Sequence, residues 1–133
     1  MERSDMPSAL RSIDAVTVPV PDLDAGIAFY SQALAQDVIW RTDQQAGLRL
    51  PEADTELVLS TERRLQPNWL VHSVEETAAR FIQNGGSVLQ EPFDIPVGRI
   101  AVVADPFGNA LVLISLCRRY TTDSEGRVTG TAG

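Results

Sequence analysis

The sequence predicts an α+β fold in which two tandem βαβββ modules form one cupped mixed sheet. The first observation is a repeat, since residues 15–60 and 66–115 each read as a strand, a helix and further strands in the same order. The second is the spacing of the candidate helix caps, Asp22 and Ser73, which lie 51 residues apart. A repeat of this period favours two copies of one supersecondary unit over two unrelated halves. Two matched curved sheets would enclose a cleft.

The 133 residues suit one domain with a buried core. We expect this domain at residues 12–117, with module boundaries at about 12–61 and 66–117. The termini, residues 1–11 and 118–133, are expected to be flexible. The C-terminal segment is rich in Thr, Gly and charge and offers almost nothing to bury.

In the first module, an alternating strand at 13–20 leads into a helix that Asp22 caps and that runs to about Ala35. Strands are expected at 38–42, 47–50 and 56–61.

The second module repeats this order. A strand at 68–71 precedes a helix that opens with the capping box of Ser73 and Glu76 and ends at Asn84-Gly85-Gly86. Three strands follow at 87–91, 99–104 and 110–116, the last two joined by a tight turn at 105–109.

Composition excludes several function classes. Eighteen acidic and eleven basic residues give a net charge of -7, which disfavours nucleic acid and anionic membranes as partners and mildly favours a cationic or neutral ligand. All basic residues are Arg, so a Schiff-base lysine mechanism is excluded. Cys117 is the single cysteine, which leaves no disulfide framework and points to a reducing cytoplasm. No signal peptide or membrane span is expected.

Three motifs together carry a family resemblance: the strand exit Val20-Pro21-Asp22-Leu23, the helix containing Phe29-Tyr30, and the turn Asp105-Pro106-Phe107-Gly108-Asn109. With the repeat, they make residues 12–116 resemble the vicinal oxygen chelate superfamily of glyoxalases, bleomycin-resistance proteins and extradiol dioxygenases. The resemblance implies paired modules around a cupped cavity, often completed by dimerisation, and a divalent metal in enzymatic members. We therefore expect a small-molecule ligand and a homodimer.

In enzymes of this superfamily, the metal ligands come from the first and the closing strand of each module and are His, Glu and sometimes Gln. Three of the four corresponding side chains here have no donor atom, and the fourth is a neutral amide, so the resemblance points to a member without the usual metal ligands. The four positions are Ala15, Val58, Gln66 and Val112.

A weak alternative metal site could be formed by Glu56, Gln66 and His72, which share strand parity with the expected positions. Asp14 is expected on the opposite face of its strand, because side chains alternate with a period of two. No residue is assigned a catalytic role.

The cavity lining is inferred from the same parity. Trp40 is the open aromatic candidate, whereas Trp69 has the wrong parity and is expected to pack under the second helix. Arg99 could anchor a carboxylate or phenolate, although an Arg at a strand start is more often a surface group. The candidate ligand-binding residues are Thr17, Trp40, Glu56, Ser60, Gln66, Asn68 and Arg99.

Three functions are compatible with these patterns. The first is a metal-free small-molecule binding protein, similar to the drug-sequestering members, which needs no cofactor. The second is a metal-dependent lyase, isomerase or dioxygenase with an atypical site and a divalent metal. The third is a dimeric interaction module whose cavity is vestigial and filled by its own side chains.

Overall fold

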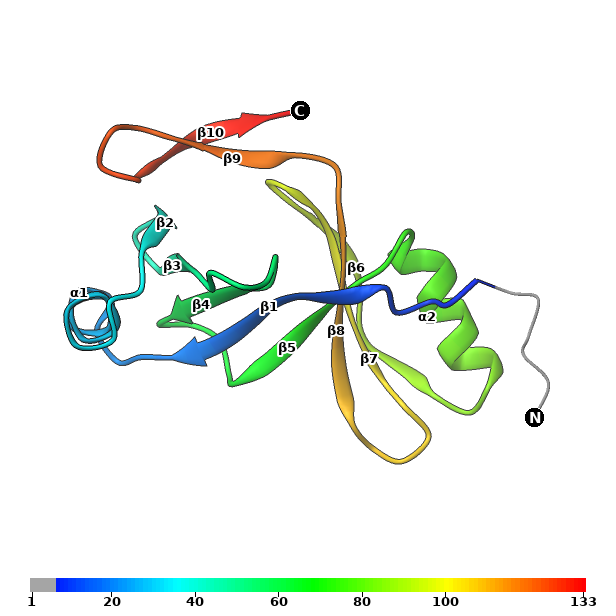
Figure 1. Cartoon of the computed structure of the whole chain (residues 1–133). Coiled ribbons are helices and arrows are strands. Elements are labelled where there is room, and N and C mark those ends of the chain that lie inside the picture. The colour runs from blue at the N-terminus through cyan, green and yellow to red at the C-terminus, as the bar shows by residue number, and fades with distance from the viewer. Residues whose placement is uncertain (1–6) are drawn as a thin grey trace.

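The computed structural model describes residues 7–133, and within them two βαβββ modules build one mixed sheet of eight strands (Figure 1). The first module consists of β1 (Ser12–Pro19), α1 (Leu23–Ala28), a π-helical turn η1 (Phe29–Ala33), β2 (Val38–Arg41), β3 (Gln45–Arg49) and β4 (Glu56–Ser60). The second consists of β5 (Gln66–Leu70), α2 (Val74–Gln83), β6 (Ser87–Ile95), β7 (Gly98–Ala104) and β8 (Ala110–Leu116).

The sheet order shows that the two modules are copies of one unit. The strands run β2-β3-β4-β1-β5-β8-β7-β6. Counted outward from the centre, the order is β1-β4-β3-β2 in the first module and β5-β8-β7-β6 in the second, so corresponding strands take corresponding places. Within the halves, β1 pairs with β4 and β5 pairs with β8, both in parallel. The halves join where β1 and β5 pair antiparallel, with Thr17 opposite Gln66. The predicted α+β fold is confirmed, and the modules pair within one chain.

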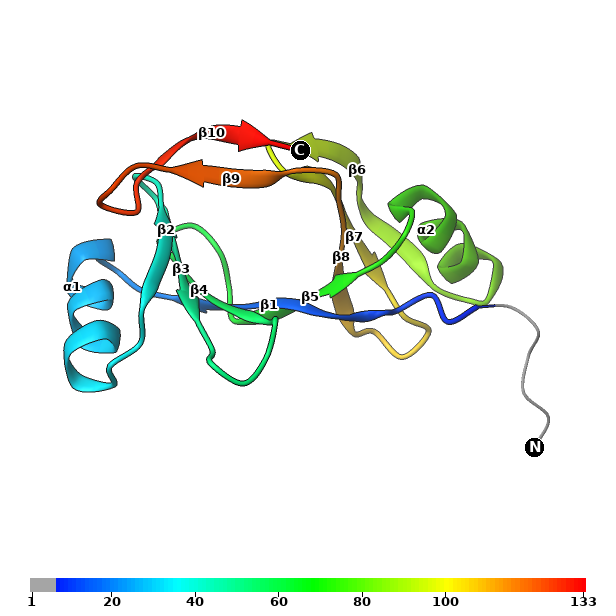
Figure 2. The ribbon, with the colours of Figure 1, turned by 45° about the horizontal axis from the view of Figure 1, so that its top comes forward.

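Each helix covers the outer face of its own module, and the two helices lie at opposite ends of the molecule (Figure 2). Leu23 of α1 packs on Ala46, Leu48 and Leu59. The core under α2 is likewise apolar, and Trp69 packs against it, as its strand parity predicted. Its fully buried members are Val71, Val74, Ala78, Ala101, Val103 and Leu113.

Both predicted helix caps are formed. Asp22 accepts a hydrogen bond from the backbone N–H of Ala25 at 2.9 Å, and Ser73 accepts one from Glu76 at 3.1 Å. The first helix departs from the sequence expectation after Ala28, where it widens into η1 instead of continuing as an α-helix to Ala35. No helix in residues 7–133 has the length and apolar character needed to cross a membrane.

The C-terminal segment corrects the sequence analysis, because it is a β-hairpin and not a loose tail. Strands β9 (Arg119–Thr122) and β10 (Val128–Ala132) cross the open side of the cup (Figures 1 and 2). Tyr120 and Val128 of the hairpin pack against the inner cluster around Trp40. These two apolar contacts are not evident from the polar composition of the segment. At the other terminus, residues 1–6 of the expected flexible segment lie outside the described residues, and Arg11 donates a backbone hydrogen bond to Leu70.

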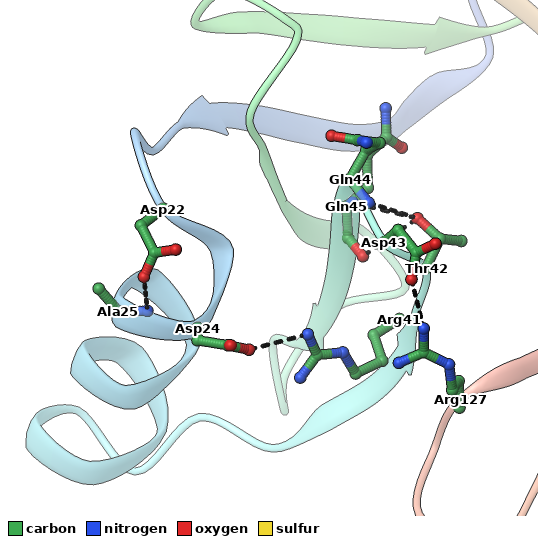
Figure 3. A network of polar contacts seen from close by, with 9 residues as sticks. All are labelled: Asp22, Asp24, Ala25, Arg41, Thr42, Asp43, Gln44, Gln45 and Arg127. Carbon is green, nitrogen blue, oxygen red and sulfur yellow. Dashed lines mark hydrogen bonds and ion pairs between the residues drawn. The ribbon is translucent and has the colours of Figure 1, made fainter.

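Polar contacts fix the tip of this hairpin to the β2–β3 turn (Figure 3). Arg127 forms an ion pair with Asp43, and the backbone N–H of Arg41 donates to the carbonyl oxygen of Gly126 at 3.0 Å. The Arg41 side chain in turn pairs with Asp24 of α1 at 2.9 Å. The hairpin is therefore connected through β2 to the first helix.

The Arg41 amide reports directly on this docking, because its hydrogen bond ends on the hairpin. We expect this amide to be protected from hydrogen exchange, and Arg127→Ala to speed its exchange up to about fivefold, since an exposed ion pair contributes at most about 1 kcal/mol. Residue-resolved exchange by NMR measures both rates. Arg64→Ala, at an exposed position, is the matched control. Unprotected exchange in the unmodified chain would show that the hairpin is not docked.

Candidate functional site

The inner face of the sheet and the hairpin border a partly open cavity of about 500 Å³. Strands β1, β4 and β5 form its floor with Ala15, Thr17, Val58 and Asn68, the residues whose parity predicted this direction. The second module contributes an apolar wall that includes Ile100 and Ile114. The root of the hairpin adds Arg118, Arg119, Tyr120 and Thr122.

Asp14 also lines the cavity, and here the sequence expectation is wrong. The register between β1 and β5 shifts after the pair Ile13 and Trp69, because the next pair is Ala15 and Asn68. Asp14 is the extra residue of this irregularity, so the strict alternation of side chains is interrupted at its position. Asp14 and Ala15, although neighbours in the chain, therefore both reach the cavity.

Asp14 and Glu56 form an acidic pair in the lining. Glu56 lies on β4 opposite Ala15, next to Asp14 on the adjacent strand. Burial of the Asp14 carboxyl and the nearby charge of Glu56 raise the pKa of Asp14 to about 6. Within residues 7–133, no side chain or backbone group donates a hydrogen bond to the Asp14 carboxylate.

Trp40 forms the wall beside this pair. Its Nε1–H donates a hydrogen bond to Oε1 of Glu56 at 2.7 Å, and its ring lies 4.9 Å from the ring of Tyr120, centroid to centroid, at an angle of 44°. The indole lies against Gly47 so closely that a Cβ there would be 2.0 Å from Nε1. The indole can occupy this position because Gly47 on β3 has no side chain.

Asn68 is the polar residue of the floor whose hydrogen bonding is incomplete. It is only 9% exposed, it lines the cavity, and its Oδ1 is buried without a hydrogen-bond partner in the described part of the chain. A buried acceptor left unpaired costs about 1–3 kcal/mol. A ligand that brings a donor recovers this free energy if the amide turns its oxygen, which has almost no accessible surface, toward the cavity.

Three residues expected in the lining lie elsewhere. The Ser60 hydroxyl is buried and accepts the backbone N–H groups of Glu62 and Arg63, both at 3.1 Å, so it stabilises the turn after β4. Gln66 is half-buried but outside the lining. Arg99 pairs with Glu75 and Asp94 on the surface, each at 2.6 Å, which is the surface role that the sequence analysis weighed against an anchoring one.

The side chains present do not fit the metal ligand set that the resemblance implies. Ala15 and Val58 line the cavity without a donor atom. The alternative set is not assembled, because Glu56 faces the cavity while His72 is exposed outside it. In residues 7–133 no three or more His, Cys, Asp or Glu side chains gather closely enough to hold a metal ion. We therefore derive no chemical step through a metal.

The comparison with family models decides the family. The model described as a glyoxalase-like domain matches residues 15–114. The chain belongs to the glyoxalase-like domain family. The predicted resemblance to the vicinal oxygen chelate superfamily is thereby confirmed.

Two curated relatives are similar to this member of the family. The anthracycline biosynthesis protein DauV of Streptomyces sp. (strain C5) is 27% identical over 95% of this chain and 49% of its own length. The anthracycline biosynthesis protein DnrV of Streptomyces peucetius is 35% identical over 47% of this chain and 24% of its own length. The chain spans about half the length of the first relative and a quarter of the second.

Solved structures share the fold at low identity. Methylmalonyl-CoA epimerase from Mycobacterium tuberculosis has a TM-score of 0.69 at 20% identity, over 84% of this chain and 92% of that one. A variant of homoprotocatechuate 2,3-dioxygenase from B. fuscum has a TM-score of 0.60 at 22% identity, over 83% of this chain and 33% of that one. These likenesses establish the fold alone.

The close contact between Gly47 and Trp40 gives a test of the cavity wall. Gly47→Ala should displace the indole and break its hydrogen bond to Glu56, lowering the free energy of unfolding by about 1–3 kcal/mol. Urea denaturation followed by circular dichroism measures the loss. Gly130→Ala is the control, because the nearest atom to its added Cβ would be 3.5 Å away. Equal stability of the two variants would contradict the placement of Trp40.

Asp14 should make the ligand-free protein less stable at neutral pH than at low pH. Because its folded pKa, about 6, lies above its ordinary value of 3.8, the carboxyl contributes stability below about pH 4 that is lost as the pH rises through 6. Asp14→Asn should therefore stabilise the protein on the order of 1 kcal/mol at about pH 8 and change little at about pH 4. Urea denaturation across this pH range, with the exposed Asp37→Asn as control, measures the difference. A uniform effect at all pH values would refute it.

Proposed function

We propose that this protein binds a small planar aromatic molecule in the cavity, without a metal, and that binding itself is its function. The observation that carries the proposal is the cavity of about 500 Å³ closed on one side by the ring pair of Trp40 and Tyr120. Ligand sites of roughly 300–1,000 Å³ with apolar walls and a few polar groups are typical of drug-sized ligands. Here Thr17 and Asn68 supply polar groups between the apolar side chains.

The relatives indicate a chemical class for the ligand. Both are named anthracycline biosynthesis proteins, so a fused-ring aromatic compound of the anthracycline kind is the ligand we propose. A flat ring system can lie against the indole of Trp40 and the apolar wall formed by Ile100 and Ile114. The absence of metal-ligating atoms in the side chains of Ala15 and Val58 supports binding without metal.

The open cavity favours a binding function over the interaction module with a vestigial cavity, because that alternative requires the cup to be filled by its own side chains. Self-association can accompany ligand binding. The proposal includes the homodimer that the resemblance implies and the reducing compartment that the single free Cys117 suits. Light scattering of the purified protein measures its oligomeric state.

An acid–base enzyme is the second candidate, and Asp14 is the observation in its favour. A carboxylate with a pKa of about 6 that faces a cavity suits a general base at neutral pH. Such a base could remove a proton from a carbon next to a carbonyl, as an isomerase requires. Turnover of a ligand that binds in the cavity would favour this candidate, and stoichiometric binding without turnover would favour the first.

Doxorubicin, a commercial anthracycline, tests the binding proposal. We expect calorimetry to show saturable binding at one site per chain, unchanged after dialysis against a chelator, with the recovered compound chemically intact. Trp40→Leu should weaken binding about tenfold or more, since it removes the aromatic wall. Trp69→Phe is the matched control, because Trp69 packs under α2 away from the cavity.

Two results would overturn the proposal. One is equal affinity of the Trp40 and Trp69 variants, which would locate binding outside the cavity. The other is loss of binding with the chelator together with about one transition-metal ion per chain in elemental analysis, which would restore the metal-dependent enzyme.

A further inference from the structure

We infer that the ligand carries a protonated nitrogen, held at a cation subsite formed by Asp14, Glu56 and Asn68 beside the ring of Trp40. This inference rests on the proposed binding function and specifies the chemical class of its ligand. Three features of the cavity support it: an acidic pair that forms no ion pair, a buried amide oxygen that accepts no hydrogen bond, and an aromatic side chain that holds one of the carboxylates.

The acidic pair has no cation of its own. Asp14 and Glu56 both line the cavity and lie on the adjacent strands β1 and β4. The ion pairs of the described chain all lie elsewhere and use Arg41, Arg99 and Arg127. Two carboxylates close together in a partly buried site repel each other, so a bound positive charge would relieve both.

Three arginines also line the cavity. Arg63 follows β4, and Arg118 and Arg119 lie in the exposed root of the hairpin. None of the three forms an ion pair with Asp14 or Glu56 in residues 7–133.

Asn68 is the second, independent observation. It sits in the lining, 9% exposed, and its Oδ1 accepts no hydrogen bond in the described chain. A protonated nitrogen presents N–H donors and no acceptor, so its partners would be the two carboxylates and, once the Asn68 side chain turns its oxygen toward the cavity, the amide oxygen. An anionic or purely acceptor ligand would leave this oxygen unpaired.

Trp40 completes the subsite. Its Nε1–H holds Oε1 of Glu56 at 2.7 Å, which fixes that carboxylate beside the indole. A divalent metal ion is a poorer occupant, because in residues 7–133 no three His, Cys, Asp or Glu side chains gather closely enough to hold one.

Three planar tricyclic probes of similar size separate charge from shape. At about pH 8, where Asp14 is ionised, 9-aminoacridine is a cation, acridine is uncharged and anthracene-9-carboxylate is an anion. We expect 9-aminoacridine to bind at least about tenfold more tightly than acridine, and the anion to bind most weakly, since one charge-assisted hydrogen bond is worth a factor of about ten or more. Fluorescence titration at fixed salt measures all three affinities.

Conservative variants assign the effect to residues. Asp14→Asn and Glu56→Gln keep shape, and the Gln can still accept the Trp40 hydrogen bond. Each should weaken 9-aminoacridine about tenfold and acridine less than threefold. Asp37→Asn removes the same net charge at an exposed position and should change neither, which excludes general attraction by the charge of -7.

The outcomes distinguish this inference from the binding function on which it rests. Equal affinity for 9-aminoacridine and acridine, unaffected by Asp14→Asn but lost in Trp40→Leu, would overturn the cation subsite and leave aromatic binding intact. Preference for the anion would overturn it as well. Binding of none of the three probes, and none of doxorubicin, would overturn both.

Discussion

The antiparallel pairing of β1 with β5 is the constraint on which the rest of the structure depends. It is the one junction between the two modules in the eight-stranded order, and it directs the inner faces of both halves toward one space. The same junction carries the irregularity between Ile13 and Ala15, which admits Asp14 to the cavity. The β1–β5 pairing thus joins the two halves into the cup. The irregularity within it places Asp14, whose pKa is raised, in the cavity. The position of Glu56 follows from the neighbouring parallel pairing of β1 with β4.

Without a ligand, the polar groups in the cavity lower the stability of the folded state. Asp14 loses hydration beside another carboxylate, and Oδ1 of Asn68 is buried without a partner in the described chain. A core selected only for stability would place apolar side chains here, as it does on the outer face under α1 and α2. Groups that are individually unfavourable and lie together in one cavity favour a binding role, because a complementary ligand offsets all of them at once.

The sequence was sufficient for features that depend on regular periodicity. The 51-residue repeat gave both modules, and strand parity correctly placed Thr17 and Val58 in the cavity and Trp69 under α2. Parity failed at Asp14, because a single extra residue in a strand leaves no mark in the pattern. The sequence also could not reveal the hairpin, since Tyr120 is stabilised by Trp40, a partner eighty residues away. Ser60 and Arg99 have the residue types of a binding site but are engaged by local partners.

The hairpin bears on what distinguishes this chain within its fold. The family model matches residues 15–114, which supply the floor and walls but not β9 and β10. The similarity to DauV covers 95% of the chain, more than those residues can account for, so it extends beyond the matched domain toward the hairpin. A fold shared with an epimerase and a dioxygenase cannot by itself determine the ligand. The hairpin brings Tyr120 against Trp40 and arginines to the cavity, so under the proposed binding function ligand choice would depend on contacts between the cup and the C-terminal strands.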